Sequence, residues 1–101
     1  MAITSSVSAD GKTLTLVLDE RFDFAVHSAL RAAYAGSNPR FEQYVIDLRN
    51  TVYMDSSALG MLLQLKEHAG GGPRALRIRN ASQAIRDILA VANFHQLMQI
   101  E

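Results

Sequence analysis

The chain has 101 residues, enough for one compact domain and too few for a second hydrophobic core. Ten basic and ten acidic side chains give zero formal charge and there is no cysteine, so nothing favours nucleic-acid binding, disulfides or a thiolate site. No apolar run approaches the roughly 20 residues that span a bilayer, and the first residues lack a signal-peptide pattern. We expect a single domain over residues 1–101, located in the cytoplasm, without nucleic-acid binding or direct membrane insertion.

The first third of the chain predicts a β-hairpin followed by a helix. Residues 3–9 and 13–18 flank an Asp-Gly pair, which is typical of tight turns because glycine adopts positive φ without strain. Leucines alternate with β-branched residues in the second of these strands, which predicts one buried face. Helical spacing begins after Asp23, the predicted N-cap of a helix over residues 24–35.

The rest of the chain alternates strands and helices. Short β-branched runs predict strands over residues 44–48 and 75–79. Between them, residues 57–68 predict a helix that ends at a Gly-Gly-Gly-Pro run. A third helix follows its predicted N-cap, Ser82, and ends near Asn93, before a last extended segment. This order, ββαβαβα(β), predicts an α/β fold with a largely parallel sheet after the hairpin.

No complete catalytic or metal-binding constellation is visible in the sequence. The three histidines fall on three different predicted elements without ligand spacing, so we expect neither a metal nor a cofactor. Ser56 lies between a strand and a helix, where a serine hydrolase carries its nucleophile. The residues around it do not form a Gly-x-Ser-x-Gly motif, and no histidine has a clear claim to be its base. A serine hydrolase is therefore a distant alternative.

Two features of the second predicted helix call for more than an ordinary core helix. Three small polar residues precede it, Asp55, Ser56 and Ser57, whereas an N-cap through Asp55 or Ser56 explains only one of them. Apolar residues also surround most of its circumference. They are Ala58, Leu59, Met61, Leu62, Leu63 and Leu65. Either part of this helix faces a partner protein, or the helix is buried on two sides.

The segment VIDLRNTVYMDSSALGMLL resembles the signature of STAS domains, and within them of bacterial anti-sigma factor antagonists. In that family a strand ending in Asp-Leu leads through a short loop to Met-Asp-Ser-Ser/Thr-Gly-Leu-Gly at a helix start. The segments ERFDFAVHSAL (20–30) and NASQAIRDILAVANF (80–94) are similar to two further family segments, and Asp23 matches the family's aspartate. The resemblance implies an α/β STAS fold: a mixed sheet of four or five strands, opened by the N-terminal hairpin, with three or more helices packed on it.

The resemblance implies partner switching and no catalysis. Such a protein, a monomer or weak dimer, binds an anti-sigma factor while unphosphorylated. Phosphorylation of the serine after the aspartate, here Ser56, by a serine kinase that is often the anti-sigma factor itself breaks the complex, and a serine phosphatase restores it. By the same resemblance, the expected partner-binding residues are Asp23, Met54, Asp55, Ser56, Ser57, Ala58, Gly60 and Met61.

Three residues depart from the family pattern, and one other function stays open. Ala58 stands at a usual glycine, and its methyl group is expected to narrow the access of a kinase to the serine. Glu20 and Arg21 replace a usual glycine and glutamate, which changes the charge near Asp23. The alternative is a STAS subunit that scaffolds a membrane transport complex, such as the cytoplasmic component of a phospholipid transporter, and that need not be phosphorylated.

Overall fold

The computed structural model describes residues 3–36, 41–70, 72 and 74–101. Its strands are β1 (Thr4–Val7), β2 (Thr13–Val17), β3 (Arg21–Phe22), β4 (Gln43–Asp47), β5 (Tyr53–Met54), β6 (Leu76–Arg79) and β7 (Gln99–Ile100). Its helices are α1 (His27–Ala35), α2 (Ser56–Ala69) and α3 (Gln83–Val91), with short 3₁₀ turns at Phe24–Val26 and Phe94–Gln96. None of the helices in these described ranges is long and apolar enough to cross a bilayer.

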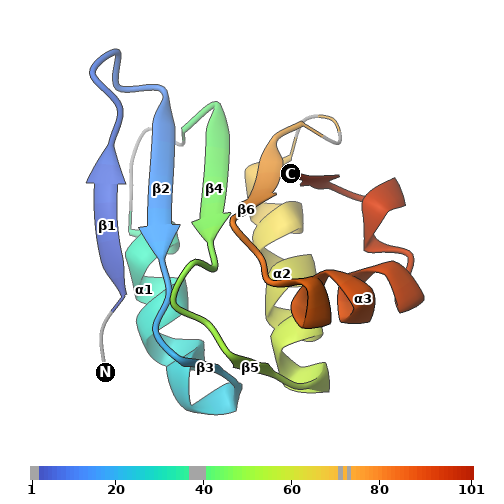
Figure 1. Ribbon diagram of the computed structural model, residues 1–101. Coiled ribbons are helices and arrows are strands. Elements are labelled where there is room, and N and C mark those ends of the chain that lie inside the picture. The colour runs from blue at the N-terminus through green and yellow to red at the C-terminus, as the bar shows by residue number, and fades with distance from the viewer. Residues whose placement is uncertain (1–2, 37–40, 71, 73) are drawn as a thin grey trace.

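Five strands form the main sheet, in the order β1-β2-β4-β6-β7. β1 runs antiparallel to β2, whereas the later strands pair in parallel because a helix lies in each connection between them. Figure 1 shows α1 and α2 behind this sheet, with α3 next to α2. The predicted mixed α/β sheet, opened by an N-terminal hairpin, is therefore confirmed.

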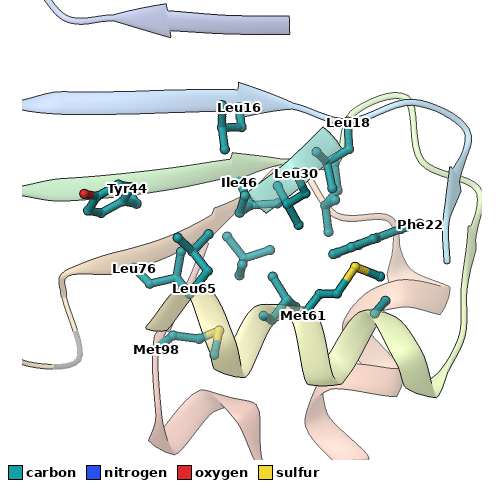
Figure 2. Close-up of a cluster of buried hydrophobic side chains, with 14 of the residues drawn as sticks. Leu16, Leu18, Phe22, Leu30, Tyr44, Ile46, Met61, Leu65, Leu76 and Met98 are labelled. Carbon is teal, nitrogen blue, oxygen red and sulfur yellow. The ribbon is translucent and has the colours of Figure 1, made fainter. Parts of the chain in front are cut away.

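One hydrophobic cluster joins the sheet to the helices. The leucines of β2 alternate with half-buried β-branched residues, as their spacing predicts. Figure 2 shows Leu16, Ile46 and Leu76 of three neighbouring strands facing α2, which contributes Met61 and Leu65. Burial of each such side chain stabilises the fold by about 1.5–3 kcal/mol relative to exposure. The sheet and α2 therefore hold each other in place, and α2 begins at a fixed position.

The second helix is buried along one face. Leu59 packs partly against the core and lines a hollow together with Ile88 and Val91 of α3, while Leu63 remains exposed. Four side chains of α2 lie in the core: Ala58, Met61, Leu62 and Leu65. These four recur at spacings of three and four residues and therefore form one face of the helix, while Leu63 lies outside it. The structure does not show burial on two sides, and a partner on the remaining surface of the helix stays a prediction.

The ends of the helices follow their predicted caps with small differences. Residues 24–35 were expected to be one helix, but the first turn is 3₁₀ and α1 itself begins at His27. The second helix extends one residue beyond each predicted end, because Asp55 caps its start and Gly70 ends it with a φ of 62°. Gly71 and Pro73 of the predicted helix stop lie outside the described residues.

The short strands β3 and β5 were not predicted. They form a separate two-stranded parallel sheet just beyond the main sheet, and they lead into α1 and α2 (Figure 1). Each is two residues long, which is too short to show any hydrophobic periodicity in the sequence. This small sheet positions the segment that carries the predicted site.

Candidate functional site

The β3–β5 pair brings two helix starts together. Arg21 lies opposite Tyr53, and Phe22 lies opposite Met54, in parallel register. One residue further along each strand comes an aspartate, Asp23 or Asp55, so the register places these two aspartates next to each other. Because side chains alternate along a strand, the buried Phe22 and Met54 point into the core, while the residues that flank them point the other way.

Asp55 caps α2 through one carboxylate oxygen. Its Oδ1 accepts hydrogen bonds from the backbone N–H of Ser57 at 3.0 Å and of Ala58 at 3.3 Å, and from the Ser57 hydroxyl at 2.6 Å. The Ser57 hydroxyl is the largest cause of a lowered pKa of Asp55; the two N–H groups and the nearby Arg21 act in the same direction, against a smaller effect of burial. Asp55 is thus a carboxylate over the whole neutral pH range.

The two serines of the motif occupy different environments. Ser57 is half-buried, and its hydroxyl donates to the Asp55 cap. Ser56 is the first residue of α2 and is exposed. The cap therefore accounts for Asp55 and Ser57, and it leaves Ser56 as the serine that presents its side chain to solvent at a helix N-terminus.

Asp23 repeats the capping arrangement on the neighbouring strand. Its Oδ1 accepts a hydrogen bond from the N–H of Ala25 at 3.0 Å, which confirms its predicted role as a cap. Its Oδ2 forms an ion pair with Arg21 Nε at 3.2 Å. The Arg21 guanidinium also lies over the Tyr53 ring, 4.1 Å from the ring centre. Arg21 is therefore held between the two strands of the small sheet.

A shallow groove of about 220 Å³ runs between α1 and α2 beside the predicted site. Phe24 forms one wall of it; this side chain is 67% exposed and is stacked on His27 with the ring centres 4.9 Å apart. Aromatic side chains are enriched in protein–protein interfaces, which makes this ring a candidate contact for a partner. The lining residues are Phe24, His27, Ser57, Gly60, Met61 and Gln64.

The predicted partner-binding residues divide into a surface group and a buried group. Asp23, Asp55 and Ser57 are half-buried, and Ser56 and Gly60 are exposed. Met54, Ala58 and Met61 are buried in the core cluster, although Met61 also forms part of the groove. The expectation that the methyl group of Ala58 narrows access to the serine is wrong, because this side chain is fully buried and faces the core.

Sequence reasoning missed the residues that fix the loop before β5. Asp47, at the end of β4, is only 1% exposed, and its carboxylate accepts hydrogen bonds from Arg49 Nη2 at 2.6 Å and from Asn80 Nδ2 at 3.1 Å. Burial raises the pKa of Asp47, but these hydrogen bonds outweigh it and the net change is downward. The buried Thr51 then donates to the carbonyl of Asp19 at 2.8 Å. The Asp-Leu pair at the end of the predicted strand is the feature of the sequence that could have pointed to Asp47.

Phe24 and Tyr53 were also missed as surface residues of the site. In the predicted helix over residues 24–35, helical spacing places Phe24 on the same stripe as Leu30 and Tyr34, and these two side chains are buried. Phe24 departs from this stripe because the first turn is 3₁₀, and side chains in such a turn repeat every three residues.

Among the described residues, no three histidine or acidic side chains gather as metal ligands do.

Comparison with known proteins agrees with the signature found in the sequence. A family model described as "Mlab, STAS domain" matches residues 5–99. A STAS-domain containing protein of Pseudomonas aeruginosa (strain UCBPP-PA14) is 50% identical over 100 residues, which cover 99% of each chain.

Among solved structures, the unphosphorylated anti-sigma factor antagonist SpoIIAA is similar with a TM-score of 0.71 at 19% identity, over 99% of this chain and 87% of that one. A phosphorylated form of SpoIIAA from Bacillus gives 0.70 at 18% identity, over 99% and 91%. A sulfate transporter family protein of Wolinella succinogenes gives 0.73 at 15% identity, over 88% and 71%. At these identities the structural likeness concerns the fold.

Proposed function

The chain belongs to the STAS family, and from that membership we propose that it is an anti-sigma factor antagonist that works by partner switching. In this proposal the unphosphorylated protein binds an anti-sigma factor, a serine kinase phosphorylates Ser56, and a serine phosphatase reverses the modification. The observation that carries the proposal is the division between the two serines: Ser57 is engaged by the Asp55 cap, whereas Ser56 is exposed at the start of α2. The protein then acts by binding and not as a catalyst.

A phosphate on Ser56 is compatible with the fold. The N-terminus of a helix favours negative charge, because the first N–H groups and the helix dipole point toward it. At neutral pH the phosphate adds roughly 1.5 to 2 negative charges. These charges arrive next to Asp55 and near Asp23, and so change the surface around the groove without removing any contact of the core. Binding is therefore lost at the interface while the domain stays folded.

The alternative is a STAS scaffold subunit of a membrane transport complex. One observation favours it: the fold is as similar to a sulfate transporter family protein as to SpoIIAA, with TM-scores of 0.73 and 0.71. In this case the domain would dock on a transport ATPase or a permease, and Ser56 would need no phosphate. The intact Met-Asp-Ser-Ser motif favours the phosphorylation switch over this scaffold.

Affinity capture with substituted baits separates the two functions. Ser56→Ala and Ser56→Asp would be used as baits in extracts of the source cells, with quantitative mass spectrometry of the proteins recovered. We expect an anti-sigma factor with Ser56→Ala and at least tenfold less of it with Ser56→Asp. Recovery of a transport ATPase with both baits would favour the scaffold. The melting temperature of Ser56→Asp should stay within a few degrees of the parent protein.

Ser82→Asp is the matched control for this experiment. Ser82 caps α3 with its hydroxyl at 3.3 Å from the N–H of Ile85, and aspartate is an equally good cap. The substitution thus places the same charge at a second helix N-terminus, and it should leave binding unchanged. A Ser56→Asp variant that still binds the anti-sigma factor, or one that unfolds, would contradict the mechanism as proposed.

A further inference from the structure

We propose that Arg21 is the internal counter-ion of a phosphate on Ser56, and that it exchanges its ion pair with Asp23 for one with the phosphate. This inference rests on the proposed function, because it concerns regulation of the same site. Arg21 stands where the STAS signature usually has a glutamate, so the device belongs to this chain and not to the family pattern.

The position of Arg21 follows from the small sheet. Arg21 and Asp23 lie on one face of β3, and Tyr53 and Asp55 lie on the same face of β5, since Phe22 and Met54 point into the core. Paired strands are about 4.8 Å apart, and an arginine side chain is longer than this spacing. Figure 1 shows β3 and β5 running side by side toward α1 and α2. Ser56 follows directly after Asp55, whose pKa the nearby Arg21 helps to lower.

Arg21 contacts Asp23 and the Tyr53 ring, and both contacts lie at the surface. Its side chain is 62% exposed, and its ion pair with Asp23 uses Nε at 3.2 Å. Exposed ion pairs of this kind are weak because water screens them. A phosphate offers three acceptor oxygens and up to twice the charge of a carboxylate, and arginine binds it through two parallel N–H donors. A nearby phosphate therefore competes well against Asp23 for this guanidinium.

Arg21 is surrounded mainly by negative charge. Asp19, Glu20 and Asp23 line a hollow together with it on one side. Asp55 lies on the other side, and Arg21 contributes to its lowered pKa, after the larger effect of the Ser57 hydroxyl. His27 of α1 faces the neighbouring groove. In the unphosphorylated protein Arg21 thus neutralises part of an acidic surface, and its transfer to the phosphate would leave Asp23 uncompensated. The modification would change the docking surface at two points instead of one.

The second ionisation of the phosphoserine reports this contact directly. Phosphoserine would be incorporated at position 56 during translation, and the ³¹P chemical shift would be followed from pH 4 to pH 8. A nearby cation stabilises the dianion and lowers the second pKa, which is about 6 without it. We therefore expect Arg21→Ala to raise this pKa by about 0.5 unit relative to the unsubstituted phosphoprotein, and Arg21→Lys to raise it by less.

Arg74→Ala is the control for the loss of one positive charge. Arg74 is exposed and precedes β6, so it lies at the end of the parallel sheet opposite to the site. A shift in Arg21→Ala no larger than the shift in Arg74→Ala would overturn the inference. All variants should keep dispersed amide spectra, since both side chains are exposed.

Failure of this inference and failure of the proposed function give different results. The phosphate is installed without a kinase, and its pKa is measured without a partner. If Arg21→Ala raises the pKa while Ser56→Asp still binds the anti-sigma factor, the counter-ion stands and the switch fails. If the pKa is unchanged while Ser56→Asp loses binding, the switch stands and Arg21 takes no part in it.

Discussion

Neighbouring residues at the start of α2 have different roles, which their order in the sequence does not reveal. Asp55 and Ser57 form one hydrogen-bonded cap, whereas Ser56 faces solvent between them. Ala58, the next residue, turns its methyl group into the core, where it is fully buried. A departure from the family pattern at this residue therefore affects the stability of the helix and leaves the surface unchanged. The departures at Glu20 and Arg21 are the ones that alter the surface, because both side chains are exposed.

Ala58→Gly tests this assignment at the residue scale. Glycine in a helix costs about 1 kcal/mol relative to alanine, and the lost methyl group leaves a small gap in the core. We expect the free energy of unfolding in urea to fall by about 1 to 2 kcal/mol. Phosphorylation and anti-sigma binding at a temperature well below the melting point should stay unchanged. Faster phosphorylation of this variant would contradict the assignment, because it would mean that the Ala58 methyl group restricts access to Ser56.

The elements of the fold position the site by where they begin. β3 and β5 pair over only two residues each, yet their register sets Asp23 and Asp55 next to each other at the starts of two helices. α2 is fixed in turn by its burial against the sheet and α1. Gly60 does not contribute to this fixed position of α2, because a glycine weakens a helix. No atom of the surrounding protein lies within 4 Å of the place where its Cβ would stand. Crowding inside the protein therefore does not require this glycine.

Gly60→Ala separates stability from binding at the scale of this helix. The added methyl group enters open space, so the variant should unfold with a free energy about 0.5 to 1 kcal/mol higher than the parent protein. Gly60 lines the groove, and a methyl group there should reduce the affinity for the anti-sigma factor severalfold. Urea unfolding and calorimetric titration measure the two effects. If the variant is more stable but its affinity for the anti-sigma factor is unchanged, Gly60 does not belong to the interface.

Over the whole molecule, several carboxylates tie distant segments together. Glu101, next to β7, pairs with Arg77 at 2.6 Å and with Arg79 of β6 at 3.3 Å. The hydrogen bond from Arg77 is the largest cause of the lowered pKa of Glu101. Asp47 links the end of β4 to the residue after β6, since Asn80 donates to it. These contacts link β4, β6 and β7 near the end of the sheet at which the site lies.

The stability of the whole molecule should therefore fall in acid. The pKa values of Asp10, Asp47, Asp55 and Glu101 are all lowered in the folded state. The unfolded chain then binds more protons below about pH 4.5, so the stabilisation is complete above the unfolded pKa values and is lost as the pH falls through the lower folded ones. Urea unfolding midpoints measured from pH 7 to pH 2 should be constant at first and then decline steadily.

Asp47→Asn identifies how much of this decline comes from the buried carboxylate. The variant should lose about 2 kcal/mol at pH 7, because the hydrogen bonds of Arg49 and Asn80 lose a charged acceptor. Its stability should also depend less on pH in the acid range, since Asp47 no longer titrates. An equally steep decline in this variant would assign the effect to the exposed carboxylates.

The sequence by itself determined the features that depend on neighbouring residues. Asp23 and Ser82 were found as helix caps, Asn93 as the residue near which the third helix ends, and the β2 leucines as a buried face. Each of these follows from hydrogen bonds or side-chain alternation within a few positions, so a short segment contains the whole signal.

The tertiary structure alone decided how the site is put together. The pairing of β3 with β5 joins residues about 30 positions apart, and no pattern within either segment announces it. That pairing sets Arg21 between Asp23 and Tyr53 and buries Met54 below them, while packing of α2 turns Ala58 inward. The motif in the sequence pointed to Ser56, but only the folded chain brought Arg21 close to the adjacent Asp55, because long-range register is a property of the assembled core and not of any single segment.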